Sequence, residues 1–231
     1  MIKVILWDVD GTLLNFLAAE REALRGCFAE FGLGELTDER LARYSAINRK
    51  YWQMLERGEI SKPQVLRGRF EEFFASEGLP CPDTDALNGR YQILLGDTVV
   101  FQDNAYELVK QLKGRVEQYA VTNGTAVAQE RKLNKSGLIH LLDGVFISEQ
   151  VGVEKPDKRF FDRVFEEIGR RPANEVLIVG DSLTSDMAGG NNAGIRCCWY
   201  NPAGAAVPEG LSIQYNIQNL WELDDILRDD I

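Results

Sequence analysis

The sequence has few of the residues on which many catalytic and structural devices depend. Its 231 residues contain one histidine and four cysteines. His140 lies in an apolar stretch away from the polar motifs described below, so no histidine-based catalysis is predicted. The cysteines form no CxxC pair and lack a histidine-rich neighbourhood, so we expect neither a zinc site nor a disulfide framework. A reduced, cytoplasmic protein is the simplest interpretation.

Long apolar runs and an excess of positive charge are also missing. No segment is long enough to span a bilayer, and the apolar start of the chain is interrupted by carboxylates too soon for a signal peptide. Lys and Arg number 26 against 36 Asp and Glu, which gives a formal net charge of −10. This charge would repel a phosphate backbone. We therefore expect neither a membrane nor a nucleic acid polymer as a partner.

Five short apolar runs, each followed by polar or loop-forming residues, are typical of strands buried in a parallel sheet. We expect these strands at residues 3–7, 116–121, 144–147, 176–179 and 196–200. Stretches with apolar residues at helical spacing separate most of them, and we expect helices at 104–112, 126–135, 158–168 and 184–193. Alternating strands and helices predict an α/β fold with a doubly wound, Rossmann-like parallel sheet.

One long interval departs from this alternation. Residues 16–95 contain no convincing strand but show helical periodicity, and glycines divide them into roughly four helices. We therefore predict a catalytic core formed by residues 1–15 and 96–231. A helical bundle of residues 16–95 is inserted after the first strand.

Two aspartates follow the first expected strand directly. Asp8 and Asp10 would lie at the carboxyl end of the sheet, where open α/β sheets bind ligands. Carboxylates so close together repel each other unless a positive charge intervenes, and Mg²⁺ prefers oxygen ligands of this kind. Asp181, at the end of another strand, would complete such a site. Taken alone, the Asp-x-Asp-Gly pattern is equally typical of a plain turn.

Three further motifs follow later strands. Thr122-Asn123-Gly124 offers a hydroxyl and backbone N–H groups that suit phosphate oxygens, and Lys155-Pro156 would aim an ammonium group at the sheet end. The segment from Asp181 to Asp186 carries two carboxylates around the start of a helix. Each motif alone is ordinary. Four in order at one edge of a sheet indicate a phosphate-handling site.

These four ordered motifs resemble those of the haloacid dehalogenase superfamily. The resemblance implies that Asp8 is a nucleophile that attacks phosphorus, and that Asp10 is the acid that protonates the leaving oxygen and later the base that activates water. It implies a Mg²⁺ site formed by Asp8, the main-chain carbonyl of Asp10 and Asp181, with Asp186 in support. The phosphate-binding residues that it implies are Thr122, Asn123 and Lys155. Asn15 stands where many relatives carry an acidic residue.

The insert resembles a helical cap of this superfamily, and residues 46–52, 57–61, 68–71 and 147–153 resemble the branch of bacterial pyrimidine 5′-nucleotidases. This second resemblance implies a phosphatase, more narrowly a 5′-nucleotidase, acting on a nucleoside monophosphate. It places Asn48 and Trp52 against the base or sugar, with Arg69 assisting. We expect the protein to be a monomer or a homodimer.

Other functions remain open at this point. A sugar-phosphate phosphatase or phosphomutase would use the same core residues. A 2-haloacid dehalogenase also uses an aspartate nucleophile, but it needs neither Mg²⁺ nor the acid that Asp10 provides. A phosphorylation-dependent signalling module also combines aspartates, Thr and Lys around Mg²⁺, without such an insert. A silent binding protein would retain the motifs without turnover.

Overall fold

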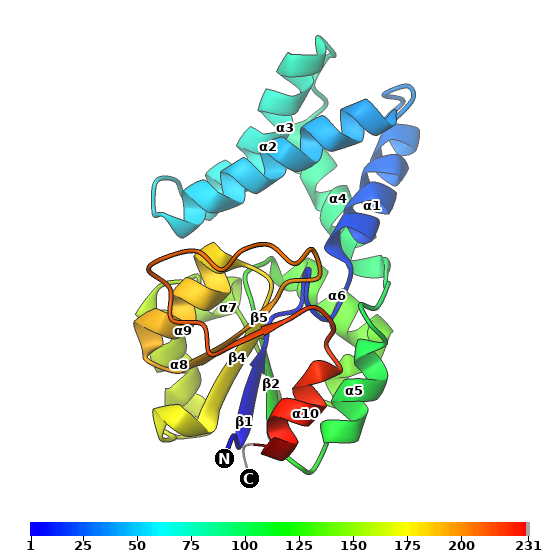
Figure 1. Ribbon diagram of the computed structural model, residues 1–231. Helices are drawn as coiled ribbons and strands as arrows, with labels where there is room; N and C mark the ends of the chain where they lie inside the picture. The colour runs from blue at the N-terminus through cyan, green and yellow to red at the C-terminus, as the bar shows by residue number, and fades with distance from the viewer. Residues whose placement is uncertain (230–231) are drawn as a thin grey trace.

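The core of the protein is a six-stranded, all-parallel sheet in the order β3-β2-β1-β4-β5-β6, seen in a computed structural model that describes residues 1–229 (Figure 1). The strands are β1 (Val4–Trp7), β2 (Glu117–Thr122), β3 (Gly144–Ile147), β4 (Val176–Gly180), β5 (Arg196–Tyr200) and β6 (Tyr215–Ile217). The predicted fold class is confirmed. The sequence analysis found the first five strands and missed β6, a three-residue edge strand.

The central strands are apolar because the sheet is covered on both faces. Every residue of β1 and β4 is buried. On one face, Trp7 of β1 belongs to the same hydrophobic cluster as Leu108 of α5 (Ala105–Leu112) and Leu223 of α10 (Glu222–Asp229). The next side chain along β1 towards its start, Leu6, lies on the other face in a cluster with Phe161 of α8 (Lys158–Ile168).

Four helices form the helical insert, which stands above the carboxyl edge of the sheet (Figure 1). They are α1 (Phe16–Glu30), α2 (Asp38–Glu56), α3 (Lys62–Glu77) and α4 (Thr84–Asp97). Their packed faces form a third hydrophobic cluster that is rich in aromatic rings. Asn15 caps α1 by accepting a hydrogen bond from the Ala18 N–H at 2.9 Å, so the residue that departs from the family pattern has a local structural role here.

The insert contacts the core at two places. At one, α4 packs on α6 (Ala126–Ser136) so closely that a Cβ at Gly96 would lie 2.8 Å from the carbonyl oxygen of Ala128. At the other, the turn between α2 and α3 reaches the core, where Lys62 donates to Ser148 at 2.8 Å. Thr184 donates to Glu56 of α2 at 2.6 Å. The insert therefore contacts the core at two separate points around the carboxyl edge of the sheet.

Short elements complete the described chain: η1 (Leu138–His140), α7 (Ser148–Val151), η2 (Ala173–Glu175), η3 (Leu183–Met187) and α9 (Ala188–Ala193). The helix expected at 184–193 thus consists of a π-helical turn, η3, followed by α9. Within residues 1–229, no helix combines the length and apolar character needed to cross a membrane.

Candidate active site

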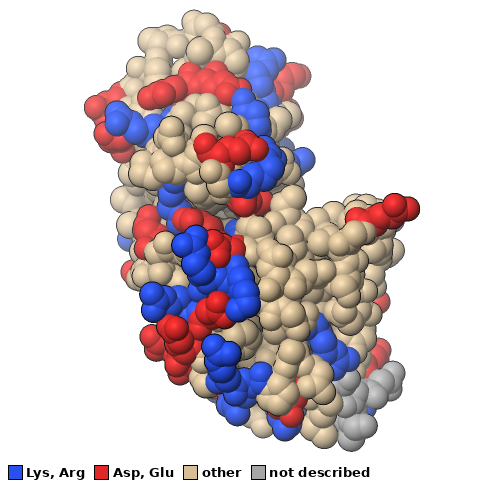
Figure 2. Space-filling model, turned by 90° about the vertical axis from the view of Figure 1, so that its left-hand side faces the viewer, with Lys and Arg blue, Asp and Glu red and all other residues tan. Residues whose placement is uncertain are grey.

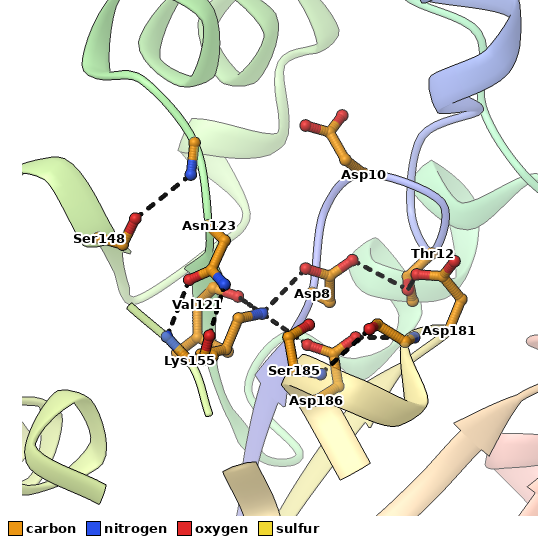
Figure 3. Close-up of polar contacts among 12 residues, drawn as sticks. Asp8, Asp10, Thr12, Val121, Asn123, Ser148, Lys155, Asp181, Ser185 and Asp186 are labelled. Carbon is orange, nitrogen blue, oxygen red and sulfur yellow. Dashed lines mark hydrogen bonds and ion pairs between the residues drawn. The ribbon is translucent and has the colours of Figure 1, made fainter. Parts of the chain in front are cut away.

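The site lies where three neighbouring strands end. Asp8 follows β1, Asp181 follows β4, and Thr122 is the last residue of β2. Because β1 is paired with both β2 and β4 in parallel, these positions share one edge of the sheet. Figure 3 shows the side chains of Asp8, Asp181 and Asp186 gathered there.

Three carboxylates form the centre of the site. Asp8, Asp181 and Asp186 each offer an oxygen, and these oxygens all lie within 4.8 Å of one another. Burial and then repulsion from Asp186 raise the pKa of Asp8 well above its usual value. Loss of hydration among the surrounding protein groups and repulsion from Asp186 raise the pKa of Asp181 to about 7, although part of this residue is still exposed. The cluster is therefore costly to keep ionised without added positive charge.

Lys155 supplies part of that charge. Its fully buried ammonium group lies 3.0 Å from Asp8 Oδ1 and 2.6 Å from Asp186 Oδ1, and it donates to the Val121 carbonyl at 2.6 Å (Figure 3). Burial disfavours the charged ammonium, but attraction to Asp186 and Asp8 outweighs this cost and raises the pKa of Lys155. Three carboxylates and one ammonium leave two negative charges. A hard divalent cation suits both this charge and an all-oxygen donor set.

The turn after β1 orients Asp8. The Thr12 hydroxyl donates to Asp8 Oδ2 at 3.1 Å. Gly11 adopts a φ of +97°, and a Cβ there would lie 2.6 Å from Asp181 Oδ2. A residue with a side chain would be strained and would collide with the carboxylate cluster, so the glycine of the Asp-x-Asp-Gly motif is required by both conformation and space.

The predicted phosphate-binding residues lie beside this cluster. The buried Thr122 Oγ1 has no hydrogen-bond partner among the described residues. The Asn123 amide is already paired with the backbone of Lys155, donating to its carbonyl at 2.8 Å and accepting from its N–H at 2.9 Å. The Asn123 side chain thus fixes the segment that carries the buried ammonium, although Asn123 also lines the cavity.

Asp10 lies apart from the three carboxylates, and its side chain is turned away from them (Figure 3). One of its oxygens accepts from Gln129 Nε2 at 2.7 Å, and the other is paired with the ammonium of Lys132. Both partners come from α6. The two aspartates of the motif therefore occupy different electrostatic surroundings although one residue separates them.

The predicted substrate residues of the insert belong to a buried polar network. Arg69 donates to Asn48 Oδ1 at 2.9 Å and to Asn88 Oδ1 at 2.8 Å, and the Asn48 amide donates to Glu20 at 2.9 Å. The Arg69 guanidinium also lies 4.9 Å from the ring centroids of both Phe70 and Tyr91. Asn48 and Arg69 are thus held by each other.

A cavity of about 610 Å³ joins the two groups of residues. Asp8, Asp10 and Asp181 line it from the core, and Asn48, Trp52 and Arg69 line it from the insert. Figure 2 shows an indentation between the lobe of the insert and a projecting part of the core, bordered mostly by residues other than Lys, Arg, Asp and Glu. The arrangement can hold a charged group at the sheet edge and a larger group beneath the insert.

Sequence reasoning missed several residues that contact the predicted ones. Thr12 was given no role in the site, although a hydroxyl four residues after an aspartate at a strand end was an available signal. Gln129 and Lys132 looked like ordinary positions of an amphipathic helix. Glu20 carried no signal, because only the packing of α1 on α2 brings it to Asn48.

Comparison with known proteins assigns this architecture, a parallel sheet with a buried aspartate after its first strand and a helical insert over it, to a class of hydrolases. A family model described as haloacid dehalogenase-like hydrolase matches residues 2–194. The chain belongs to this family, as its motifs predicted, and it is therefore a hydrolase.

Several relatives cover most of the chain, among them the following three. The HAD-hydrolase YfnB of Bacillus subtilis is 37% identical over 97% of this chain and 95% of its own. Its crystal structure, bound to magnesium and described as revealing interdomain movement, matches with a TM-score of 0.91 over 98% of each chain. The pyrimidine 5′-nucleotidase PynA of Streptococcus pneumoniae is 38% identical over 87% of this chain and 84% of its own. The pyrimidine 5′-nucleotidase YjjG of Escherichia coli is 32% identical over 96% of both.

Proposed function

We propose that this protein is a Mg²⁺-dependent phosphatase that hydrolyses nucleoside 5′-monophosphates and prefers pyrimidine bases. The observation that carries the proposal is the position of Asp8, a buried carboxylate between Lys155 and Thr12 in the wall of a cavity that the insert also lines. The names of the relatives PynA and YjjG support the nucleotide as substrate. That the substrate is a small-molecule phosphate ester follows from the family. The preference for pyrimidine bases is the finer part of the proposal.

In this proposal Asp8 and Asp10 divide the chemistry. An oxygen of Asp8 attacks phosphorus while Asp10 gives a proton to the departing nucleoside oxygen, which leaves a phosphoryl group on Asp8. Asp10 then removes a proton from a water molecule as that water attacks phosphorus. Phosphate is released and the Asp8 carboxylate is restored. The separate surroundings of the two carboxylates support separate roles.

The transferring phosphoryl group would be bound by Thr122, Asn123 and Lys155. The unpartnered hydroxyl of Thr122 supports a contact with a phosphate oxygen, since buried hydroxyls normally have partners. Lys155 would offset the negative charge of the group directly. Asn123 would act through its hold on the Lys155 backbone and through the loop that it begins.

The ligands proposed for Mg²⁺ are Asp8, the main-chain carbonyl of Asp10 and Asp181, with Asp186 in support. The two uncompensated negative charges and the oxygen donors support a hard divalent ion, and the magnesium in the YfnB structure supports its identity. When bound, Mg²⁺ supplies positive charge that stabilises the phosphoryl group during transfer. Asp186 also accepts a hydrogen bond from the Ser182 N–H at 3.0 Å, which fixes its carboxylate.

The insert, proposed as residues 16–95, would act as the cap that selects the leaving group. Asn48 and Trp52 would contact the base or sugar, and Arg69 would assist by holding Asn48. Their place in the cavity wall opposite Asp8 supports this division between core and insert.

The test is phosphate release from pyrimidine and purine nucleoside 5′-monophosphates, sugar phosphates and p-nitrophenyl phosphate, with Mg²⁺ or with a chelator. We expect Mg²⁺-dependent turnover with the highest kcat/KM on pyrimidine nucleotides. Asp8→Asn should abolish turnover, whereas Asp225→Asn, an exposed change on α10, should leave it intact. Preference for sugar phosphates would refute the nucleotidase, and turnover without Asp8 would refute the mechanism.

A further inference from the structure

Asp10 is held by two side chains of α6 that no motif assigns. The ammonium of Lys132 is paired with Asp10 Oδ1, and Gln129 Nε2 donates to Asp10 Oδ2 at 2.7 Å. Lys132 and Gln129 are both 1% exposed, although long polar side chains are rarely buried so fully without a specific partner. Their spacing of three residues puts them on one face of the helix.

The contacts of α6 with its surroundings fix the positions of Lys132 and Gln129. Gln129 fits against Gly124, where a Cβ would lie 2.6 Å from Gln129 Nε2. Thr125 caps the helix by accepting from the Ala128 N–H at 3.3 Å. On another side of α6, Arg131 forms two hydrogen bonds with Asp97 at the end of α4. The helix that holds Asp10 is thus fixed to both the core loop and the insert.

We propose that Lys132 and Gln129 are positioning residues that hold the Asp10 carboxylate beside the leaving oxygen of the substrate. In-line transfer to Asp8 puts that oxygen on the side of phosphorus opposite Asp8, and the Asp10 side chain is turned away from Asp8 (Figure 3). With one donor on each oxygen, the carboxylate cannot rotate freely, and each oxygen keeps a further site for a proton. The inference rests on the proposed phosphatase function.

Two substrates whose leaving groups differ in their need for a proton distinguish a positioning role of Lys132 and Gln129 from a role in protein stability alone. A nucleoside oxygen leaves poorly without a proton, whereas p-nitrophenolate leaves without one, and kcat/KM reports the steps up to that departure. We expect Lys132→Met and Gln129→Met to lower kcat/KM for uridine 5′-monophosphate by about 10²-fold, the lower end of the contribution of general acid catalysis. The value for p-nitrophenyl phosphate should change by less than about threefold, and Lys132→Arg should restore part of the loss.

Two controls complete the test. Lys135→Met changes an exposed lysine of the same helix, whose partner Asp97 keeps Arg131, and it should leave both substrates unaffected. In an Asp10→Asn background, Lys132→Met should cause no further loss, because the group that it positions is gone. Equal losses for both substrates, or a full additional loss in that background, would overturn the proposal. If Lys132→Met does not fold, Gln129→Met provides the test, through the ratio of its losses in kcat/KM on uridine 5′-monophosphate and on p-nitrophenyl phosphate. Absence of turnover in the unmodified enzyme would instead refute the proposed function.

Discussion

Lys155 of the core and Arg69 of the insert are buried cations that are compensated in different ways. Lys155 is 0% exposed and contacts two carboxylates, while Arg69 is 1% exposed and contacts two amide oxygens and two aromatic rings. With its three carboxylates ionised, the core cluster has two more negative charges than Lys155 compensates. In the insert, the Asn48 amide links Arg69 to Glu20, so one positive and one negative charge balance. The core centre therefore favours binding of a further cation, whereas the charges of the insert network balance, although the buried Arg69 Nε has no hydrogen-bond partner among the described residues.

The strongest way to break this comparison is to remove the core cation. Lys155→Met should lower the free energy of unfolding by about 3–5 kcal/mol, because one partner of a buried ionic group is lost. Turnover should fall by at least ~10²-fold as charge stabilisation is lost. Urea unfolding with a chelator present and phosphate release measure the two effects. Lys158→Met, an exposed change on α8, should do neither; a stable, active Lys155→Met enzyme would contradict the account.

Binding of Mg²⁺ at the core carboxylates should stabilise the folded protein. At about 100 times its dissociation constant, Mg²⁺ should raise the free energy of unfolding by about 2.7 kcal/mol. Asp181→Asn should reduce this gain sharply, because a charged ligand is lost, and Asp225→Asn should keep it. Thermal unfolding with Mg²⁺ and with chelator measures the gain. An equal gain in the Asp181 variant would remove Asp181 from the proposed ligand set.

The same contrast explains how much the sequence could predict. Asp8 and Asp181 were found because a strand followed by a polar residue is visible locally, and parallel strands bring such ends together. Lys155 was found because the proline that follows it restricts its backbone to extended forms. The network around Asn48 could be named only through resemblance. Its partner Glu20 lies on another helix, and no local pattern encodes which helix faces meet.

Two other misses have similar causes. Lys132 looked like an ordinary position of an amphipathic helix. Its contact with Asp10 depends on where α6 lies relative to the sheet edge, which no local pattern encodes. Strand β6 has three residues, of which only Ile217 is buried, so it lacks the apolar run that marked the other strands. Local patterns thus predicted the sheet and the carboxylate cluster, but not contacts made between helices.

Removing the insert cation should have a smaller and different effect. Arg69→Met leaves the buried Asn48 Oδ1 without its donor and leaves Asn88 Oδ1 with only the hydrogen bond from Gln92 Nε2 at 3.3 Å, which should cost about 1–3 kcal/mol of unfolding free energy. KM for uridine 5′-monophosphate should rise more than kcat falls, while kcat/KM for p-nitrophenyl phosphate should stay within about threefold. The matched control is Arg67→Met, an exposed change on the same helix. Equal losses on both substrates would show that the insert network serves the chemistry rather than the leaving group.

The smallest expected effect concerns the pH dependence of the insert. Burial raises the pKa of Glu20 above its ordinary value of 4.5, against hydrogen bonds from Ser45 and Asn48 and the charges of Arg69 and Arg49. The folded protein thus binds this proton at higher pH than the unfolded chain, so the cost of burying the charge disappears as pH falls through the folded pKa. As pH falls from 7 to 5, the free energy of unfolding of the native protein should increase relative to that of the Glu20→Gln variant. Urea unfolding measures both values. The same comparison with Glu209→Gln, an exposed change, provides the control. The difference in free energy of unfolding could instead stay constant, or change in favour of the glutamine variant at pH 5. Either result would show that burial does not disfavour the charged form of Glu20 in the insert network.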